Sequence, residues 1–454
     1  MSLVSARRII TACVLPAAAA AMFVAPGAAS AAQQCSGENI KGAGASTQKL
    51  LHELWKVQFN TSTNKKACSG TQGSKGKPAL TEYQPEGSGF GLEKYGVNGH
   101  AFEAGTFSYV GTDEAPNKKQ KEEIEGNETV KGSAPESVQS IPVAQVAITI
   151  IMHLPTGCTA TSTAPGAAGR LVLNNTTLES IFKGGIKKWS EIKESGDKLE
   201  GGSCNAETPF KVFVRKDESG TTHIIKKYLG LIDGGVLAAE GGLNATWPEL
   251  SEGKPNNTSW PTATAVERPT ANGGGALASA VAGAPSSIGY VALADARKNG
   301  GFSKTGVGGP GTEKFWAEVQ HSGLSSTKPT YADPSTNGDA EALANANCLK
   351  EKYTNGKGTR FPPASTAALW NEVTTETKES KYTICGLTFG LGLSAFSAYP
   401  GTTSGVATTE ENYLVWALEP KAGGGQQLIK NHDFEPVPSS LVKEATAGAK
   451  LVKF

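Results

Sequence analysis

The sequence predicts an α/β protein with more than one lobe, and three observations support this prediction. The chain has 454 residues, enough for two or three domain-sized units. Apolar, β-branched runs typical of strands buried on both faces occur at Ile141–Met152 and Ile288–Leu293. Segments with helical spacing alternate with such strands, as where His223–Leu229 follows Phe210–Val214. This alternation is typical of parallel sheets, which bind ligands at the carboxyl ends of their strands.

Residues 1–31 have the features of a secretory signal peptide. Arg7 and Arg8 form a positively charged start, and the apolar, Ala-rich stretch Ile9–Val24 follows them. Ala29–Ala31 offers a cleavage site made of small residues. The segment therefore predicts an exported protein.

A permanent membrane anchor and a lipoprotein are the alternatives to a cleaved signal peptide. Cys13 comes before most of the apolar stretch, where a lipoprotein cysteine comes after it. Cys35 is preceded by Gln34, where a lipoprotein box needs a small residue. No later stretch is long and apolar enough to span a bilayer. We therefore expect a periplasmic or extracellular protein without a lipid anchor.

The cysteines also indicate export. Cys13 is lost with the signal peptide, and six cysteines remain: Cys35, Cys68, Cys158, Cys204, Cys348 and Cys385. An even number in an oxidising compartment predicts three disulfides, with fifteen possible pairings. We expect neighbours along the chain to pair, because each such pair closes a loop of moderate length. A zinc site is the alternative, but CxxC and HxxxH spacings are lacking.

The net charge argues against a polyanionic partner. The whole chain has a formal charge of +1, and removal of residues 1–31 takes away two arginines and no acid, leaving −1. A protein that neutralises many phosphates needs an excess of Lys and Arg, so we expect no nucleic-acid partner. A small anion needs only a local site and remains compatible with this charge.

Two junctions rich in small residues stand near the start of the mature chain. Gly42–Ser46 runs into Thr47–Phe59, whose apolar residues have the spacing of an amphipathic helix. A Gly-rich turn that opens a helix presents free backbone N–H groups and the positive end of the helix dipole to anions. Tyr83–Gly91 is a second turn of small residues, and a strand at Thr106–Val110 ends in the turn Gly111–Pro116.

The rest of the chain is less regular. Thr176–Glu179 predicts a capping box that opens a short helix. Residues 299–380 are poor in periodicity and rich in polar and small residues, so we expect a partly irregular insertion. A helix is predicted at Glu410–Leu418, with Thr409 as its cap, and a last helix begins at Ser439.

The strongest chemical signal lies between a predicted strand and the helix after it. Arg215 supplies a planar guanidinium whose paired donors fit two oxygens of an oxyanion. Ser219 and Thr221 add hydroxyls, and Gly220 lets backbone N–H groups approach a ligand. Asp217 would repel an anion, so we expect it to pair with Arg215 and orient the guanidinium. The alternative is an ordinary surface turn that contains an Arg–Asp pair.

Signals of catalysis are missing from the sequence. It has no paired catalytic carboxylates within a supporting motif, no G-x-S-x-G elbow and no metal-ligand spacing. We therefore expect a binding protein that is not an enzyme and that needs neither a cofactor nor a metal.

The chain resembles the substrate-binding component of phosphate ABC transporters. The motifs that carry the resemblance run in the family's order from about residue 40 to the C-terminus: GAGAS, YQPEGSGFG, YVGTDEAP, IPVAQVAITIIMHLP, LVLNNTTLESIFKGGIKKW, VRKDESGTT, SSIGYVALADA and FEPVP. Residues 299–380 match poorly. The resemblance implies a two-lobed, periplasmic-binding-protein-like fold (type II) with the ligand in an interlobe cleft. It also implies a monomer whose partners are inorganic phosphate and the permease of an ABC importer.

The resemblance also implies a set of ligand-binding residues. The family's phosphate-binding positions and its Arg-pairing aspartate fall on Ser46, Thr47, Ser88, Asp113, Arg215, Asp217, Ser219, Gly220 and Thr221. The ligand-facing carboxylate falls on Asp113 if Thr112 replaces the family's serine, whereas an alignment on the following Ala-Pro selects Glu114. This carboxylate accepts the proton of hydrogen phosphate, and sulfate carries no such proton at neutral pH. The carboxylate therefore predicts discrimination against sulfate.

The expected lobes are discontinuous in the sequence. The first combines residues 36–151 with 384–454, and the second is 152–383. Crossovers are expected near Met152 and Thr383, with a hinge that closes on the ligand. Two other functions stay open: a secreted phosphoester hydrolase that uses the same oxyanion donors, and a cell-surface scaffold that has lost ligand binding.

Overall fold

The computed structural model describes most of the chain after the predicted signal peptide. The described residues are 37–61, 80–129, 137–165, 167, 169–232, 258–261, 266–304, 313–321, 328–335 and 382–454. The predicted signal peptide and Cys35, Cys68 and Cys348 lie outside these ranges. Within them, no helix has the length and apolar character needed to cross a membrane.

A mixed sheet connects the two lobes. Among the described residues its main path has the order β2-β1-β3-β15-β4-β11-β8, and β12 also pairs with β4. Its strands are β1 (Ile40–Gly44), β2 (Leu80–Gln84), β3 (Tyr109–Thr112), β4 (Val138–His153), β8 (Lys211–Val212), β11 (Ser287–Ala292), β12 (Lys314–Trp316) and β15 (Cys385–Leu393). β1 is parallel to β2 and β3, and β11 is parallel to β8. In contrast, β4 is antiparallel to β15, β11 and β12, so the expectation of parallel sheets was only partly right.

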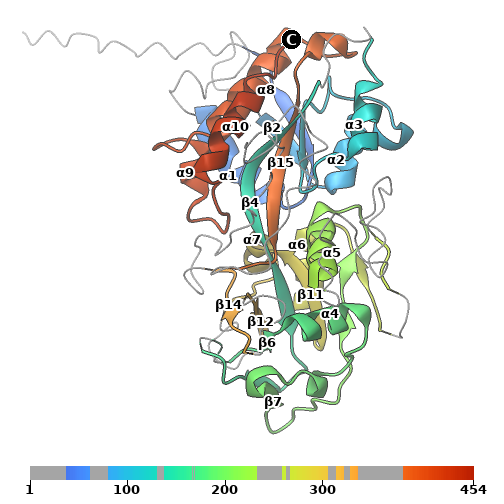
Figure 1. The fold of residues 1–454 in the computed structure, drawn as a ribbon, viewed down its shortest axis with the longest axis vertical. Coiled ribbons are helices and arrows are strands. Elements are labelled where there is room, and N and C mark those ends of the chain that lie inside the picture. The colour runs from blue at the N-terminus through green and yellow to red at the C-terminus, as the bar shows by residue number, and fades with distance from the viewer. Residues whose placement is uncertain are drawn as a thin grey trace, which may run out of the picture. The chain divides into compact units, whose positions relative to one another are not determined.

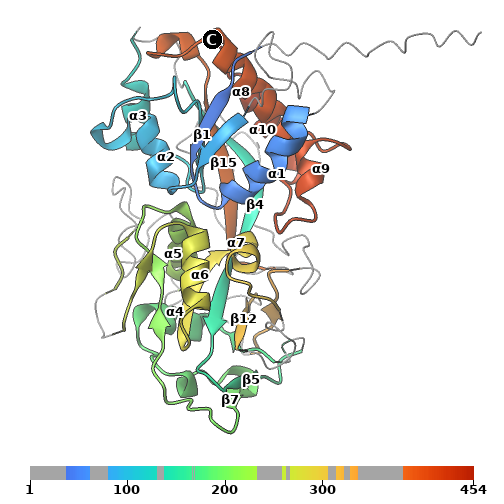
Figure 2. The ribbon, with the colours of Figure 1, turned by 180° about the vertical axis from the view of Figure 1, so that it is seen from behind.

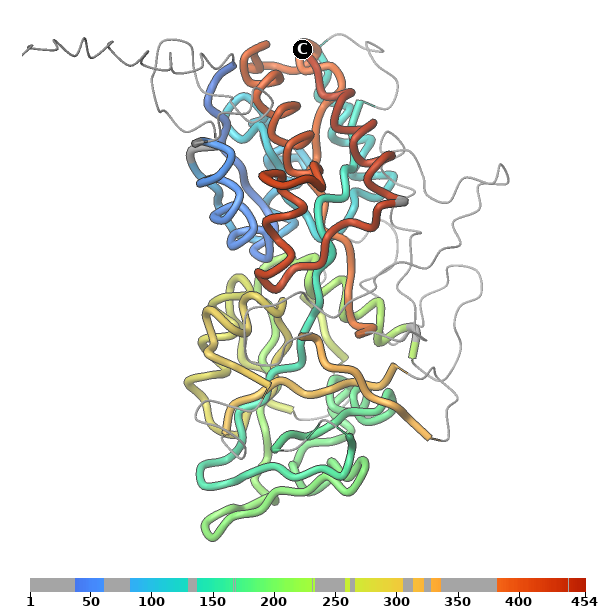
Figure 3. Tube along the Cα trace, turned by 90° about the vertical axis from the view of Figure 1, so that its left-hand side faces the viewer, coloured from blue at the N-terminus to red at the C-terminus, as the bar shows by residue number. Residues whose placement is uncertain are grey.

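The long strand β4 takes part in both lobes (Figures 1 and 3). Its first part, Val138–Ala147, pairs with β15, and its second part, Ile148–His153, pairs with β11. All sixteen residues are buried, as the apolar run in the sequence predicts for a strand covered on both faces. Close to the change of partner, the Ile148 N–H donates to the Ile384 carbonyl at 2.8 Å, just before β15 begins. The predicted α/β fold is confirmed, and the lobe boundaries stay a prediction.

Helices cover the sheet on each side of this change of partner (Figure 2). They are α1 (Gln48–Thr61), α2 (Ser88–Lys94), α3 (Lys118–Glu125), α4 (Asn175–Lys183), α5 (Gly220–Ile232), α6 (Gly274–Ala282), α7 (Leu293–Lys298), α8 (Ser404–Ala417), α9 (Gly425–Ile429) and α10 (Ser439–Ala449). In the first lobe α1 packs on β2, α2 on β1 and β3, and α8 on β15. In the second lobe α5 and α6 pack on β11.

Smaller sheets complete the second lobe. They are formed by β9 (Val214–Arg215) with β10 (Thr270–Ala271), by β5 (Thr159–Thr161) with β7 (Lys198–Glu200), and by β6 (Val172–Leu173), β13 (Glu318–Gln320) and β14 (Tyr331–Ala332). The segment predicted as one strand at 210–214 is thus split between β8 and β9, which belong to different sheets. This split matters because it places Arg215 at the end of β9, beside β10.

Two helix caps differ from the sequence-based expectation. The side chain of Asn174 caps α4 by accepting the N–H of Thr177 at 2.8 Å, where Thr176 had been expected to cap. The side chain of Thr403 caps α8 by accepting the N–H of Val406 at 3.2 Å. Each helix begins earlier than expected because a better-placed polar residue stands upstream of the expected cap.

Cys158 and Cys204 form a disulfide, one of the three pairs expected between neighbouring cysteines. The bond joins the segments next to β5 and β7 across a sequence separation of 46 residues. In the chain-entropy description, a loop of this length gives a stabilisation of about 4 kcal/mol. Cys385 is also disulfide-bonded, and its partner lies outside the described residues. The pairing of Cys35, Cys68 and Cys348 stays a prediction.

Gly44 allows β1 to approach β3 closely because glycine has no Cβ atom. Its φ is +131°, and a Cβ atom there would lie 1.9 Å from the carbonyl oxygen of Gly111. We expect Gly44→Ala to lower the free energy of unfolding by about 3 kcal/mol or more, since both backbone strain and a backbone clash oppose it. Gly99→Ala is the matched control, because Gly99 also has a positive φ but nothing lies within 4 Å of its Cβ position. It should cost only about 1–2 kcal/mol. Equal losses for the two variants in urea unfolding would contradict this account.

Candidate functional site

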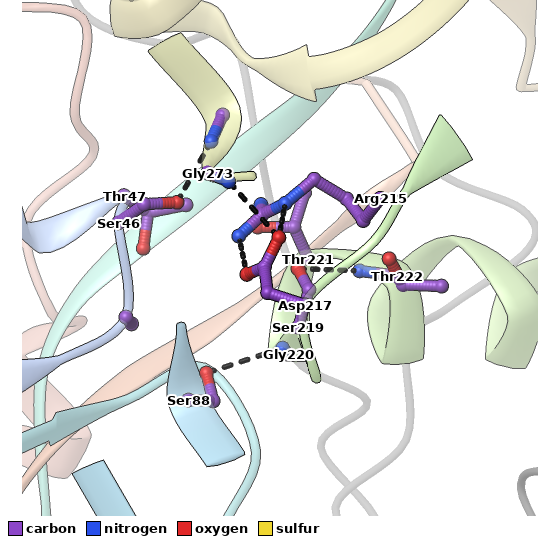
Figure 4. Close-up of polar contacts among 12 residues, drawn as sticks. Ser46, Thr47, Ser88, Arg215, Asp217, Ser219, Gly220, Thr221, Thr222 and Gly273 are labelled. Carbon is purple, nitrogen blue, oxygen red and sulfur yellow. Dashed lines mark hydrogen bonds and ion pairs between the residues drawn. The ribbon is translucent and has the colours of Figure 1, made fainter. Parts of the chain in front are cut away.

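Four helices begin at one place between the lobes, and their first residues contact one another. On the first lobe, Ser46 precedes α1 and Ser88 begins α2. The hydroxyl oxygen of Ser46 accepts the N–H of Gly274 at 2.9 Å, at the start of α6. The hydroxyl oxygen of Ser88 accepts the N–H of Gly220 at 3.1 Å, at the start of α5. Figure 4 shows these polar groups pointing toward one another from separate segments.

The start of α5 must be a glycine for this approach. A Cβ atom on Gly220 would lie 2.6 Å from the Ser88 hydroxyl oxygen and 2.7 Å from the Cβ of Asp113. Both distances are shorter than real contacts of this kind, so only glycine lets the two lobes meet here. Next to it, the Ser219 hydroxyl accepts the N–H of Thr222 at 3.3 Å, which caps the first turn of α5.

Arg215 is a buried cation at the candidate site. Its side chain is 1% exposed, and its Nε donates to Asp217 Oδ1 at 2.7 Å while Nη2 donates to Oδ2. Asp217 Oδ1 also accepts the N–H of Gly273 at 2.9 Å, which fixes the pair against α6 (Figure 4). Nη1 is buried and has no hydrogen-bond partner among the residues that the structure describes. A buried guanidinium N–H without a partner is costly unless a ligand accepts it.

The carboxylate of Asp113 accepts hydrogen bonds from three threonine hydroxyls. Thr47 donates to its two oxygens at 2.6 and 2.7 Å, Thr388 donates to Oδ1 at 2.7 Å, and Thr221 donates to Oδ2 at 3.2 Å. Its backbone N–H donates to the Ser88 hydroxyl at 3.1 Å. Burial raises the pKa of Asp113, whereas the hydroxyl donors and the positive charge of Arg215 act in the opposite direction. The carboxyl therefore lies inside the cluster that joins the two lobes.

Glu114, the other candidate for the ligand-facing carboxylate, lies elsewhere. Its Oε1 is 3.4 Å from Nδ1 of His223 on α5. Burial raises the pKa of Glu114 to about 7, Glu218 also raises it, and Lys227 lowers it. Burial lowers the pKa of His223 to about 3, so the imidazole is neutral at pH 7. The structure thus places Asp113, and not Glu114, against the threonine hydroxyls of the cluster.

Each of the nine residues assigned to the site from the sequence takes part in one of these hydrogen bonds. Thr388, Tyr290 and the Gly273–Gly274 segment also contact these residues and were not predicted from the sequence. The Gly-rich segment Asn272–Gly275, which runs into α6, carried the same signal as the other Gly-rich turns that open helices. Tyr290, whose hydroxyl oxygen accepts the Arg215 N–H at 3.2 Å, sits in a buried strand without a local signal. Within the described residues, no group of three or more His, Cys, Asp or Glu side chains could hold a metal ion.

The chain matches a known protein family. A model of the PBP superfamily domain matches residues 29–345. The chain belongs to the PBP superfamily. Comparison with curated protein sequences gave no match.

The fold is similar to those of solved structures whose titles describe phosphate-binding proteins. A phosphate-binding protein from Stenotrophomonas maltophilia is 17% identical, covers 90% of this chain and 93% of its own, and has a TM-score of 0.55. A human phosphate-binding apolipoprotein is 15% identical, with 90% and 94% coverage and a TM-score of 0.57. A high-affinity periplasmic phosphate-binding protein, PfluDING, is 16% identical, with 90% and 93% coverage and a TM-score of 0.52. At these identities the likeness establishes the two-lobed fold of this superfamily member.

Proposed function

We propose that this superfamily member is an exported monomer that captures inorganic phosphate between its lobes and delivers it to the permease of an ABC importer. The observation that carries the proposal is the buried Nη1 of Arg215, which has no partner among the described residues and stands in a cluster of hydroxyls and helix starts. A guanidinium N–H of this kind, beside the N-termini of α1, α5 and α6, favours an oxyanion. The solved structures named above are described as phosphate-binding proteins, which supports this ligand class.

Asp113 makes phosphate the preferred oxyanion. A carboxylate repels an oxyanion unless the ligand brings a proton to share. Hydrogen phosphate carries one at neutral pH, so its O–H can replace a threonine hydroxyl as a donor to Asp113. The displaced hydroxyl can then donate to a phosphate oxygen. Sulfate has no proton to offer, and its lone pairs would face those of the carboxylate.

Phosphate binding is coupled to hinge closure in this proposal. Ser46, Ser88 and Asp113 lie on the first lobe, and their partners Gly274, Gly220 and Thr221 lie on the second. A ligand that bonds to both sets holds the lobes together. We therefore expect saturating phosphate to reduce the radius of gyration in small-angle scattering and to protect the protein from limited proteolysis.

Sulfate is the control for this closure experiment, and it should change neither quantity at the same concentration. Scattering that is unchanged by bound phosphate would overturn hinge closure. Steady release of phosphate from p-nitrophenyl phosphate would instead indicate a hydrolase, and the proposal of a pure binding protein would then be wrong.

A further inference from the structure

Asp295 is a buried acid beside the candidate site that sequence reasoning did not find. It lies on α7, and 4% of the residue is exposed. Its Oδ1 accepts the side-chain amide of Asn299 at 2.9 Å. Its Oδ2 is buried and has no hydrogen-bond partner among the described residues. A buried carboxyl oxygen without a donor calls for an explanation, because its desolvation is not compensated.

The start of α6 places this oxygen at the site. A Cβ atom on Gly274 would lie 2.2 Å from Asp295 Oδ2, so the carboxyl lies directly against this glycine. The N–H of Gly274 donates to Ser46, and the N–H of Gly273 donates to Asp217, the partner of Arg215. One turn therefore touches Asp295, the first-lobe hydroxyl and the Arg215–Asp217 pair. Only glycine at 274 leaves room for this arrangement.

Two atoms without hydrogen-bond partners, one a donor and the other an acceptor, belong to side chains near the Gly273–Gly274 segment. Arg215 Nη1 can only donate a hydrogen bond, and ionised Asp295 Oδ2 can only accept one. These two described residues form no ion pair in the structure. The charge of each nevertheless shifts the pKa of the other. A ligand that satisfies both must offer an acceptor to Arg215 and a donor to Asp295. A protonated oxyanion has both.

We propose that Asp295 is a second ligand-facing carboxyl, which shares a proton with bound phosphate in addition to the proton shared with Asp113. This inference rests on the proposed function. A second carboxyl of this kind makes the site specific for an ion that carries or accepts an extra proton. The proton arrives with dihydrogen phosphate or on Asp295 itself when hydrogen phosphate binds. In both cases the complex holds one proton between Asp295 and a phosphate oxygen.

The charges around Asp295 set the pH range in which this proton is available. Burial raises the pKa of Asp295 to about 7, and the charge of Asp113 raises it as well. Arg215, the Asn299 amide and Lys49 act in the opposite direction. Below this pKa the shared proton is present. Above it both Asp295 and the ligand lose protons, and two negative oxygens would face each other. Affinity for phosphate must therefore fall as the pH rises through 7.

The test is calorimetric titration with inorganic phosphate between about pH 6 and about pH 9. For the unaltered protein, the dissociation constant should rise about tenfold per pH unit above the pKa of Asp295, the slope of one linked proton. Titration at about pH 8 in two buffers of different ionisation enthalpy should show uptake of about one proton, and this measurement needs no variant. Asp295→Asn should remove both the slope and the uptake, because its amide donates to phosphate without a proton from solvent.

Asp197→Asn is the matched control. Asp197 is buried in the second lobe against the Val172 N–H, at 2.8 Å, and burial raises its pKa to about 7 as well. The Asp197→Asn variant should keep the pH dependence of the dissociation constant that the unaltered protein shows. If Asp295→Asn keeps that slope, or if the unaltered protein takes up no proton, the role of Asp295 is wrong while phosphate binding stands. If the unaltered protein does not bind phosphate at any pH, the proposed function itself fails, and this inference fails with it.

Discussion

Replacing Arg215 with alanine is expected to cost about 3–5 kcal/mol of phosphate-binding free energy, or roughly two to four decades in the dissociation constant. The change removes the unpartnered Nη1 donor and the charge that attracts the anion. It also leaves the Asp217 carboxylate without its ion-pair partner, so an uncompensated negative charge stands beside the site. Equilibrium dialysis with labelled phosphate measures the loss.

Two further variants separate binding from folding in this experiment. Arg215→Lys keeps the positive charge but loses the planar fork, so it should bind phosphate with intermediate affinity. Arg268→Ala removes a half-buried arginine of the second lobe that donates to the Phe182 carbonyl at 2.8 Å, and it should bind like the unaltered protein. Binding by Arg215→Ala within about threefold of the unaltered protein would contradict the assignment.

The second large effect is on selectivity. Asp113→Asn replaces an acceptor by an amide that can also donate, so sulfate should gain affinity while phosphate loses it moderately. Sites that recognise a ligand O–H reject analogues without it by about four to five decades, and most of this discrimination should disappear. The ratio of the sulfate and phosphate dissociation constants, measured by competition dialysis at neutral pH, gives the result.

Glu114→Gln is the matched control for Asp113→Asn, because it makes the same chemical change one residue away. Glu114 contacts His223 and lies away from the threonine hydroxyls, so its loss should leave the ratio unchanged. Loss of discrimination in Glu114→Gln alone would show that the ligand-facing carboxylate had been misassigned by one residue. If neither variant alters the ratio, neither Asp113 nor Glu114 excludes sulfate.

The sequence was most informative where one short segment carried several functional groups. Arg215–Thr221 places a cation, its partner and the helix start within seven residues, so local chemistry indicated the site. Asp113 and Glu114 could not be distinguished locally, because their directions depend on how β3 ends beside β1. Thr388 and Asp295 come from a buried strand and a short helix, and only tertiary contacts bring them to the site.

The same limit applies to the fold. The apolar run of β4 predicted a strand buried on both faces, but nothing in it indicated that the strand changes partners from β15 to β11. Strand direction was also missed, because alternating strands and helices within each lobe gave no information about antiparallel strands that connect the lobes. Helix starts were misplaced where several capping residues stand close together, as near Asn174 and Thr403.

The most direct test of the central claim is isothermal titration of the chain lacking residues 1–31 with inorganic phosphate at neutral pH. We predict saturable binding of one phosphate per chain, unaffected by an excess of sulfate. The absence of a saturable binding signal, confirmed by equilibrium dialysis with labelled phosphate, would contradict the claim that this superfamily member binds phosphate.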